Sequence, residues 1–476
     1  MTAALQTAVK PTWRQRVLRL LPWHRRLALL ACFGVFSWAL SGMLHPLMSA
    51  LQPRPAAFMP PAVALALDGL QAPGAVLQQA GIAQVQALRL LMLDGQPWYQ
   101  ARLQGQSQPR YWHARTGAPA DLASAHAEVL ARHYLGTQEP LAYTGNLEQF
   151  NAEYAYINRL LPAARVDTQR DNGLRVYVDL YQDRLGTLVD TPKAIYSQLF
   201  LWLHSFRWLD AAGPLRPALM MLLLAATLAA CTLGAGMFTA RRKARSTLHK
   251  LHGYWGIGIV LSTLLFVFSG AWHLLHKLDK APAPLDVQAQ FNSADLPAAP
   301  TANWLLDGES LHKLSLLQLD GRPVWRLQGM RYGKPALRYL GADGSALDDL
   351  APLRYAQQRF ATYAGKLGLE TPATITLQRQ FDHDYGFVFK RLPVLKASYA
   401  DDQNTALFVD PLDGALAAVV DDTDRAEGFS FAYLHKWDFL SALGKPLKDG
   451  FVTLLALAHV LLVIGGLWLW RRRRAT

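Results

Sequence analysis

The stretch LALLACFGVFSWALSGMLHPLM, residues 27–48, decides the fold that this sequence can adopt. It contains no Asp, Glu, Lys or Arg, and it is long enough for a helix that crosses a bilayer, which needs about 20 apolar residues. A cleavable signal peptide has a shorter apolar region, so we interpret the stretch as a membrane anchor. Three further stretches pass the same test, at residues 217–238, 253–275 and 451–470. The sequence therefore predicts a membrane protein with four spans.

The positive charge of the chain gathers beside these spans. Of the 48 basic residues, 15 lie in three short flanks without any acidic residue, which leaves 33 basic against 35 acidic residues elsewhere. Such flanks are typical of the cytoplasmic side of a membrane protein, and the nearly neutral remainder excludes a nucleic-acid partner. The 15 residues are Lys10, Arg14, Arg16, Arg19, Arg25, Arg26, Arg241, Arg242, Lys243, Arg245, Lys250, Arg471, Arg472, Arg473 and Arg474.

This charge pattern predicts that both termini and the middle loop face the cytoplasm, and that two long segments face the other side. The expected order is a basic N-terminus (1–26), span one (27–48), an outer domain (49–216), span two (217–238), a cytoplasmic loop (239–252), span three (253–275), a second outer domain (276–450), span four (451–470) and a cytoplasmic tail (471–476). The only cysteines, Cys32 and Cys231, fall inside spans and are interpreted as small buried residues, so no disulfide framework is expected outside.

The second half of the chain resembles the first. The pentapeptide SGMLH (41–45) recurs as SGAWH (269–273), and the segment LWLHSFRWL (201–209) recurs as AYLHKWDFL (432–440). Between these motifs, LMLDGQPW (91–98) resembles LQLDGRPV (317–324). The order is kept and the offset drifts only from 226 to 231 residues. We interpret this as a duplication into two parallel helix–domain–helix repeats, related by a pseudo-two-fold axis along the membrane normal.

The outer segments are expected to be α+β domains. Strand-like runs such as GLRVYVDLY and TALFVDPLD end in Asp/Gly turns, and residues 121–136 and 353–368 have the apolar spacing of amphipathic helices. The predicted fold class is therefore a membrane α+β protein, in which a four-helix transmembrane bundle made of two parallel repeats carries two outer α+β domains.

Seven of the 14 histidines lie in or beside the spans, where ionisable residues are costly and usually functional. Residues His24 and His45 are separated by 21 positions, about 32 Å of helix and close to a whole number of turns. The same spacing separates His252 from His273. Under the two-fold axis, His24 faces His252 at one membrane level and His45 faces His273 at another. The simpler alternative is that single histidines rest among lipid headgroups.

Neutral imidazoles that face each other across a bundle suit the two axial positions of a haem iron. Two levels then predict two haems, one inner and one outer, with the exact pairing left open. Residues His204 and His435 are rival ligands at the outer level, and His459 in span four has no counterpart in span two and is a further candidate. The full set of candidate cofactor-binding residues is His24, His45, His204, His252, His273, His435 and His459.

Other chemistries find little support. There is no Cys pair, HExxH or tight histidine cluster for zinc, and there is no Walker loop, GxGxxG or GxSxG motif for nucleotides or acyl transfer. The aspartates between 401 and 424 are interpreted as turn residues rather than a calcium site. The patch FDHDYGF (381–387) has no assigned role, and no catalytic residue is assigned.

Taken together, WHRRLALL with SGMLHP, HGYWGIGIV with SGAWH, the paired RLLP/RLPV segments and the paired LHSFRWL/LHKWDFL segments resemble the PepSY-associated transmembrane family. The resemblance covers nearly the whole chain. It implies an iron-regulated bacterial inner (cytoplasmic) membrane protein with two periplasmic PepSY-like domains, haem b in the bundle, and electron flow toward the periplasm.

The expected function is that of a haem-dependent ferric-siderophore reductase for iron acquisition. Electrons from an unidentified cytoplasmic donor would reach a ferric siderophore or another ferric chelate in the periplasm. Reduction of Fe(III) to Fe(II) lowers the affinity of the oxygen ligands for the metal. Two alternatives stay open. One is a non-enzymatic PepSY protein that binds or regulates a periplasmic peptide, protease or protein partner. The other is a permease for iron or its chelate, which the low charge inside the spans disfavours.

Overall fold

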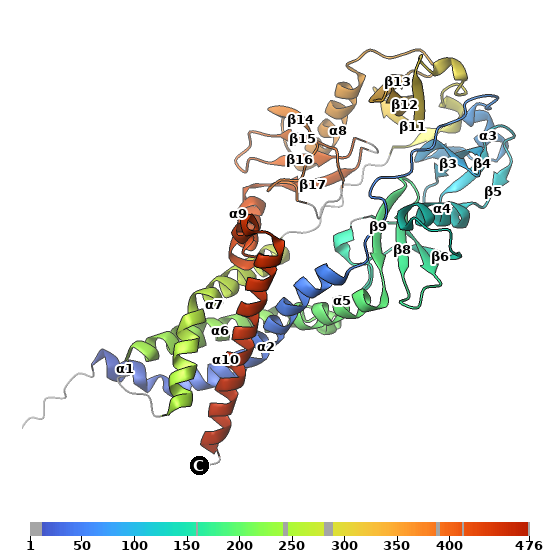
Figure 1. Ribbon diagram of the computed structural model, residues 1–476. Helices are drawn as coiled ribbons and strands as arrows, with labels where there is room; N and C mark the ends of the chain where they lie inside the picture. The colour runs from blue at the N-terminus through green and yellow to red at the C-terminus, as the bar shows by residue number, and fades with distance from the viewer. Residues whose placement is uncertain are drawn as a thin grey trace, which may run out of the picture. The chain divides into compact units, whose positions relative to one another are not determined.

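The computed structural model describes residues 12–158, 160–240, 246–279, 289–386, 391–411 and 414–474 (Figure 1). The basic residues Lys10, Arg241, Arg242, Lys243 and Arg245 of the predicted flanks lie outside this description, as do Asp413 and the last residue of the FDHDYGF patch. The chain divides into two compact units. The helical unit contains Met1–Leu51, Lys193–Pro282 and Thr423–Thr476, and the sheet unit contains Gln52–Pro192 and Ala283–Asp422.

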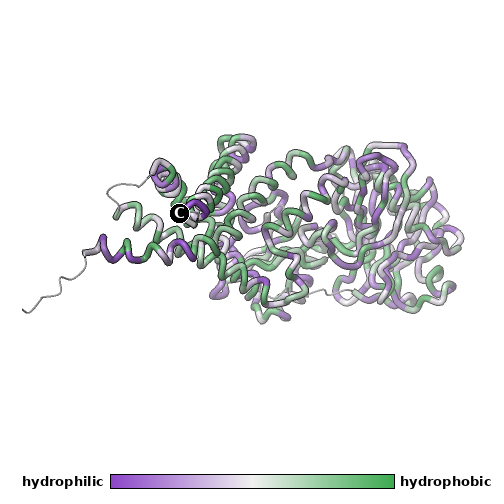
Figure 2. Tube along the Cα trace, turned by 90° about the horizontal axis from the view of Figure 1, so that it is seen from below, coloured by the Kyte–Doolittle hydropathy of each residue, from purple (hydrophilic) through white to green (hydrophobic). Residues whose placement is uncertain are grey.

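Four long helices dominate the helical unit: α2 (Leu21–Leu51), α6 (Leu215–Ala240), α7 (Thr247–Asp279) and α10 (Lys445–Arg474), preceded by the short α1 (Trp13–Arg19). Each of the four is long and apolar enough to cross a membrane, as the four predicted spans require. All four helices extend beyond the apolar stretches that predict them. Figure 2 shows these helices largely in the colour of hydrophobic residues.

The surface of this bundle is more apolar than parts of its interior. Leu261 of α7 and Leu454 of α10 are 64% and 66% exposed, whereas Ser41 of α2 and Ser269 of α7 are 0% and 1% exposed. A soluble bundle would bury the leucines and expose the serines, because apolar surface is driven out of water. The arrangement is that of a membrane protein, in which lipid covers the apolar surface and polar side chains are satisfied inside.

The bundle has a defined order of neighbours. Helix α2 packs against α6 and α10, and α7 packs against the same two helices, so that α2 and α7 occupy opposite corners. Gly34 allows the close approach of α2 and α6, because a Cβ atom there would lie 3.1 Å from the Cβ of Leu223 and 2.9 Å from the Trp38 ring. The two helices that carry the predicted inner and outer histidines therefore face each other across the bundle.

Short elements precede α6 and α10 in matching order. Helix α5 (Thr191–His204) is followed by the 3-10 turn η2 (Arg207–Ala212), and α9 (Asp422–Ser430) is followed by the π-helical turn η6 (Phe431–His435) and the 3-10 turn η7 (Asp438–Leu443). Phe206 and Trp437, 231 residues apart, both adopt positive φ angles of 49° and 57°, which large side chains rarely do. These residues fix the chain reversal directly after His204 and His435.

The sheet unit contains a seven-stranded antiparallel sheet in the order β13-β12-β11-β2-β3-β4-β5. Its strands are β2 (Ala87–Leu93), β3 (Gln96–Arg102), β4 (Arg110–His113), β5 (Pro119–Ala120), β11 (Glu309–Leu319), β12 (Arg322–Arg331) and β13 (Lys334–Leu340). The Asp94-Gly95 and Asp320-Gly321 turns have positive φ at both positions, as two-residue hairpins of this type require. Strands from both halves of the chain meet where Leu90 pairs with Leu314 and Arg89 with Ser315.

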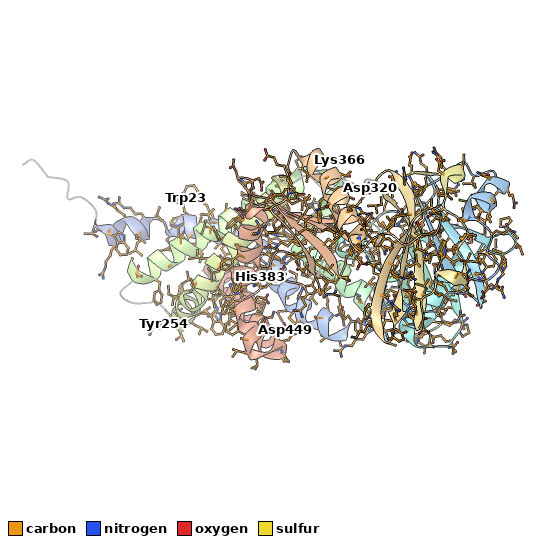
Figure 3. All side chains as sticks on the ribbon, turned by 90° about the horizontal axis from the view of Figure 1, so that it is seen from above. Trp23, Tyr254, Asp320, Lys366, His383 and Asp449 are labelled. Atoms are coloured by element: carbon orange, nitrogen blue, oxygen red, sulfur yellow. The ribbon has the colours of Figure 1, made fainter. Side chains whose placement is uncertain are left out.

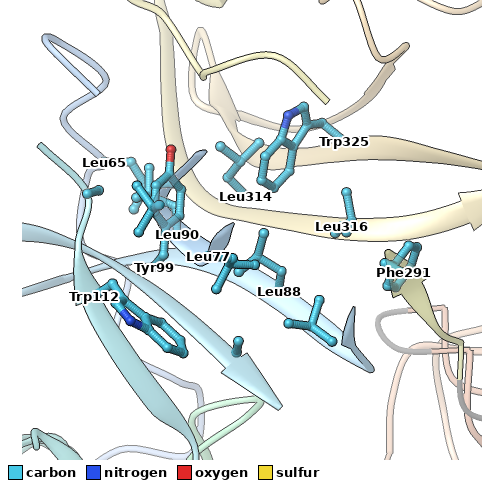
Figure 4. Close-up of a cluster of buried hydrophobic side chains, with 14 of the residues drawn as sticks. Leu65, Leu77, Leu88, Leu90, Tyr99, Trp112, Phe291, Leu314, Leu316 and Trp325 are labelled. Atoms are coloured by element: carbon cyan, nitrogen blue, oxygen red, sulfur yellow. The ribbon is translucent and has the colours of Figure 1, made fainter. Parts of the chain in front are cut away.

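The core of this sheet also combines both halves. Figure 4 shows Leu88, Tyr99 and Trp112 from the first half in one cluster with Leu314 and Trp325 from the second. A small sheet of β1 (Gln84–Val85) and β10 (Phe291–Asn292) likewise pairs the two halves, beside the short helix α3 (Pro73–Gln79). The two predicted outer domains therefore share a hydrophobic core.

Two smaller four-stranded antiparallel sheets complete the unit. One contains β6 (Leu141–Leu147), β7 (Ala163–Thr168), β8 (Arg175–Asp179) and β9 (Arg184–Val189), with helix α4 (Ala123–Leu135) packed on it. The other contains β14 (Thr374–Gln378), β15 (Val394–Ser398), β16 (Ala406–Val409) and β17 (Leu416–Val420), with helix α8 (Ala351–Leu367). The mixture of sheets, helices and four spans agrees with the predicted membrane α+β class.

Candidate functional site

The outer end of the bundle brings His204 and His435 together. Their ring centroids are 6.0 Å apart, and the ring planes are nearly perpendicular at 87°. His204 ends α5 and His435 ends η6, so neither lies on a membrane-spanning helix. Burial, with the neighbouring imidazoles of His45 and His273, lowers the pKa of His204 to about 4. Burial, with the neighbouring imidazoles of His204 and His273, lowers the pKa of His435 to about 3. Both imidazoles are therefore neutral at physiological pH.

A serine from a membrane helix contacts each of these histidines. The Oγ of Ser41 lies 2.9 Å from Nδ1 of His204, and the Oγ of Ser269 lies 3.1 Å from Nδ1 of His435. Each hydroxyl also donates to a carbonyl of its own helix, of Trp38 and of Leu265 respectively. Since that hydroxyl proton is in use, the imidazole Nδ1 donates to the serine oxygen. The lone pair of each ring then resides on Nε2, the form in which histidine binds a metal.

Phenylalanine rings connect these histidines to the next pair. Phe200 lies between His45 and His204, with ring centroids 6.0 Å and 4.8 Å away. Phe431 lies between His273 and His435, with stacked rings at 4.3 Å and 4.9 Å. The four predicted outer histidines thus form one cluster, defined here as the outer histidine cluster: His45, His204, His273 and His435.

Two carboxylates contact histidines of α7. The Nδ1 of His273 lies 2.5 Å from Oε1 of Glu427, and Nε2 of His276 lies 2.9 Å from Oδ1 of Asp424. Burial raises the pKa of the Glu427 carboxyl, but the hydrogen bond and charge of His273 outweigh this and leave its pKa below the ordinary value. A carboxylate in this position fixes the ring tautomer and raises the basicity of the other nitrogen.

The predicted inner pair lies at the other end of the same helices. The Nδ1 of His24 is 2.9 Å from the carbonyl oxygen of Ala230 on α6. Each ring packs over a glycine, since a Cβ on Gly234 would be 3.1 Å from Cε1 of His24, and a Cβ on Gly466 would be 3.4 Å from Cε1 of His252. Nδ1 of His252 is buried and has no hydrogen-bond partner among the described residues. A buried nitrogen without a hydrogen-bond partner is uncommon in proteins.

His459 differs from the other six. Its Nε2 lies 2.9 Å from Oγ1 of Thr263, and its Nδ1 lies 2.7 Å from the carbonyl oxygen of Leu455. Both ring nitrogens therefore have partners inside the bundle. A role as a ligand would require one of these hydrogen bonds to be broken.

Aromatic side chains mark the opposite end of the bundle from the outer histidine cluster. Trp23 of α2 and Tyr254 of α7 are labelled in Figure 3, and both are exposed. Trp468 of α10 is also exposed, and so are Trp202 and Trp208 on either side of His204. Exposed Trp and Tyr at helix ends are typical of the membrane–water interface.

Sequence reasoning missed several partners of the histidines. Ser41 contacts His204, 163 residues away, and Ser269 contacts His435, 166 residues away. Neither serine pairs with the histidine of its own pentapeptide in these contacts. Glu427, Asp424, Phe200 and Phe431 were not predicted as site residues. The two serines and the two phenylalanines recur at equivalent positions of both halves, and this recurrence is the signal that could have identified them. The two carboxylates have no counterpart in the first half, so no such signal exists for them.

Within the described residues there is no group of three or more His, Cys, Asp or Glu side chains that could bind a metal ion. The arrangement instead offers pairs of imidazoles. No model of a known protein family matches this chain, and a search of curated proteins finds no match.

Proposed function

We propose that this protein is a haem-containing membrane oxidoreductase that passes electrons from the cytoplasmic side to a ferric chelate on the periplasmic side. The observation that carries the proposal is the pair of neutral imidazoles His204 and His435, each oriented by a serine so that Nε2 carries the lone pair. This is the preparation that axial ligands of a haem iron need.

Two repeated helix–domain–helix units would explain the arrangement of these ligands. Equivalent hydrogen bonds recur in both halves: the hydroxyl of Tyr154 donates to the Leu160 carbonyl, and that of Tyr385 donates to the Arg391 carbonyl. The serine–histidine contacts recur in the same way. The helix-on-sheet pairs of α4 with β6–β9 and α8 with β14–β17 are the parts we assign to the two PepSY-like domains. A duplicated chain supplies matched ligands from opposite corners of the bundle.

The basic flanks support an orientation in a bacterial inner membrane. Arg14, Arg16 and Arg19 lie in or beside α1, and Arg471 and Arg472 end α10. Positive residues remain in the cytoplasm during insertion, so both ends of the chain are placed there and the sheet unit in the periplasm.

The residues fit haem b at two levels. At the outer level, His204 and His435 are the best-supported axial pair, with His45 and His273 as the neighbouring pair in the outer histidine cluster. At the inner level, His24 and His252 are the proposed axial pair. Gly234 lies against the His24 ring and Gly466 against the His252 ring, and Nδ1 of His252 has no hydrogen-bond partner among the described residues; both features suit a bulky group between the helices. Haem b, when bound, supplies a one-electron couple at two depths of the membrane.

The chain itself then performs three tasks. Ser41 and Ser269 hold the proton on Nδ1 of their histidines, and Glu427 accepts the hydrogen bond of His273 Nδ1. The apolar helices exclude water from the path between the two levels. The periplasmic surface binds the ferric chelate, whose hard oxygen ligands hold Fe(III) far better than Fe(II), so that one electron weakens the complex.

The absorption spectrum of the purified protein tests the proposal. We expect a Soret band, a sharp α-band on reduction with dithionite, and about two haems per chain by pyridine haemochrome. His204→Ala and His435→Ala should each remove one haem, and His24→Ala and His252→Ala should remove the other. His383→Ala, at an exposed position of the sheet unit labelled in Figure 3, is the matched control and should retain both.

Activity is tested by reducing the protein and adding a ferric chelate together with a colorimetric trap for Fe(II). Re-oxidation of the α-band with formation of the ferrous trap complex is the expected result. A colourless protein, or one whose spectrum survives all four histidine variants, would contradict the haem proposal and favour a binding or regulatory role for the periplasmic domains.

A further inference from the structure

The sheet unit encloses a cavity of about 70 Å³, at the seam where strands of the two halves pair. Its walls include apolar side chains of both halves, among them Leu65, Leu90 and Leu314, which are labelled in Figure 4. One part of the wall is strongly polar and contains Arg89, His126, Asp183, Lys313 and Arg326. The volume suits a few water molecules or one small ligand group.

The carboxylate in this wall is fully engaged by cations. Arg89 contacts both oxygens of Asp183, with Nη1–Oδ2 and Nη2–Oδ1 distances of 2.6 Å. Nε2 of His126 lies 3.0 Å from Oδ1 of the same carboxylate. Burial raises the pKa of Asp183, but Arg89 and His126 outweigh this and hold its pKa far below the ordinary value. This carboxylate is therefore ionised and has little capacity left for another cation.

A second buried carboxylate of the sheet unit is engaged in the same way. Asp410 is fully buried and contacts Nη1 of Arg184 at 2.6 Å and Nη1 of Arg391 at 2.9 Å. Nη2 of Arg184 is buried and has no hydrogen-bond partner among the described residues. Two guanidinium groups thus share one carboxylate.

Lys313 of β11 is a cation in the cavity wall that forms no ion pair with either of these carboxylates. Its ammonium group donates to the carbonyl oxygen of Gln182 at 3.2 Å, and no carboxylate of the described chain lies within ion-pair distance of it. Burial lowers the pKa of Lys313 to about 8, and the positive charges of Arg89, Arg184 and Arg326 act in the same direction against the attraction of Asp183. A buried cation without a counter-charge is costly, so the site favours an anion.

We propose that this cavity binds a small oxyanion, a carboxylate or phosphate group, with the ammonium group of Lys313 as its charge partner. The apolar walls lower the local dielectric constant and strengthen that ion pair, while the cavity volume limits the bound group to a few heavy atoms. The site lies within the sheet unit and does not depend on the proposed redox function.

The test is thermal unfolding of the full-length protein in detergent, followed by tryptophan fluorescence, as chloride is replaced by phosphate or acetate at constant ionic strength. A ligand at 100 times its Kd should raise the unfolding temperature of the sheet unit by roughly 5 °C. Comparing the two anions separates a phosphate site from a carboxylate site.

Lys313→Met should abolish this shift, because it keeps the length of the side chain and removes the charge. Lys334→Met, at an exposed position of β13, is the matched control and should keep the shift. An equal shift in Lys313→Met, or no shift with either anion, would overturn the proposal.

A second measurement uses the wild-type chain, in case the methionine variant does not fold. Mass spectrometry measures the rate at which each lysine is acylated. In the presence of the oxyanion that stabilises the protein, acylation of Lys313 should be slower by about tenfold or more, because a charge-assisted hydrogen bond keeps the amine protonated. The rate at Lys334 should stay unchanged. Equal acylation of Lys313 in chloride and in oxyanion would also refute the site.

Discussion

Replacing Ser41 by alanine tests whether the serine of the repeated pentapeptide prepares a histidine as a metal ligand. The Ser41 hydroxyl donates to the Trp38 carbonyl and accepts from His204, which fixes the lone pair of that ring on Nε2. Without the acceptor, the buried Nδ1–H of His204 loses its partner at a cost of about 1–3 kcal/mol. The ring is then no longer held in the tautomer that leaves the lone pair on Nε2, the nitrogen proposed to bind the iron.

The expected magnitude follows from this loss. Removal of such a supporting hydrogen bond typically lowers the affinity for the bound metal by about 10–100-fold. We expect Ser41→Ala, and likewise Ser269→Ala at the equivalent position, to release haem faster to an excess of apomyoglobin by a factor in that range. The α-band of the reduced protein is the second readout, because a changed axial ligand alters its position and intensity.

Ser262→Ala is the matched control for this experiment. Ser262 is a buried serine of α7 whose hydroxyl donates to the Ile259 carbonyl of its own helix, and it has no hydrogen bond to a histidine among the described residues. Its loss should leave haem release unchanged. If Ser41→Ala and Ser262→Ala released haem at the same rate, the serine would have no orienting role and the reasoning would fail.

Three further predictions follow from packing, charge and hydrogen bonding. Gly34→Ala places a Cβ 2.9 Å from the Trp38 ring and 3.1 Å from Leu223, so it should destabilise the α2–α6 contact by about 1–3 kcal/mol in an unfolding titration in mixed micelles, whereas Gly258→Ala, with open space around it, should have no such effect. Asp183→Asn should destabilise the sheet unit by about 3–5 kcal/mol in urea at pH 7, because it leaves Arg89 without its counter-charge. The pKa of Asp183 is lower in the folded than in the unfolded protein, so its contribution to the free energy of unfolding is complete above the unfolded pKa of about 4 and is lost progressively below it. The difference in free energy of unfolding between wild type and Asp183→Asn should therefore become smaller in acid. His459→Ala should keep the visible spectrum of the wild type, because both ring nitrogens have partners in the bundle; loss of one haem would instead make His459 a ligand.

Much of the architecture follows from local pattern. Apolar length alone predicts the four spans, and the amphipathic segments 121–136 and 353–368 are confirmed as α4 and α8 to within two residues. The Asp-Gly pairs of the two resembling segments, 91–98 and 317–324, form two-residue hairpins, the turn that this dipeptide favours. These features depend on residues close in sequence, so that periodicity and turn chemistry contain the necessary information.

The contacts that define the site depend on distant residues. Ser41 meets His204 across 163 positions, and Glu427 meets His273 across 154. No local pattern indicates such pairs, because the chain that separates them contains whole domains. For the same reason, no local pattern predicts the Arg89–Asp183 pair, because Arg89 lies in β2 and Asp183 lies in the turn between β8 and β9, 94 residues later. The duplication predicts that the two halves correspond, whereas which side chains meet is decided by tertiary packing.

The pairing of β2 with β11 has a consequence for biosynthesis. Leu90 and Leu314 are partners in the sheet, yet about 220 residues separate them along the chain. At a translation rate of about 5–20 residues per second, β11 is synthesised roughly 10–45 s after β2, and the edge of β2 stays unpaired during this time. A nascent polypeptide with an open strand edge invites wrong partners. Ribosome pausing or truncation between these strands should therefore yield aggregates rather than a half-size folded product.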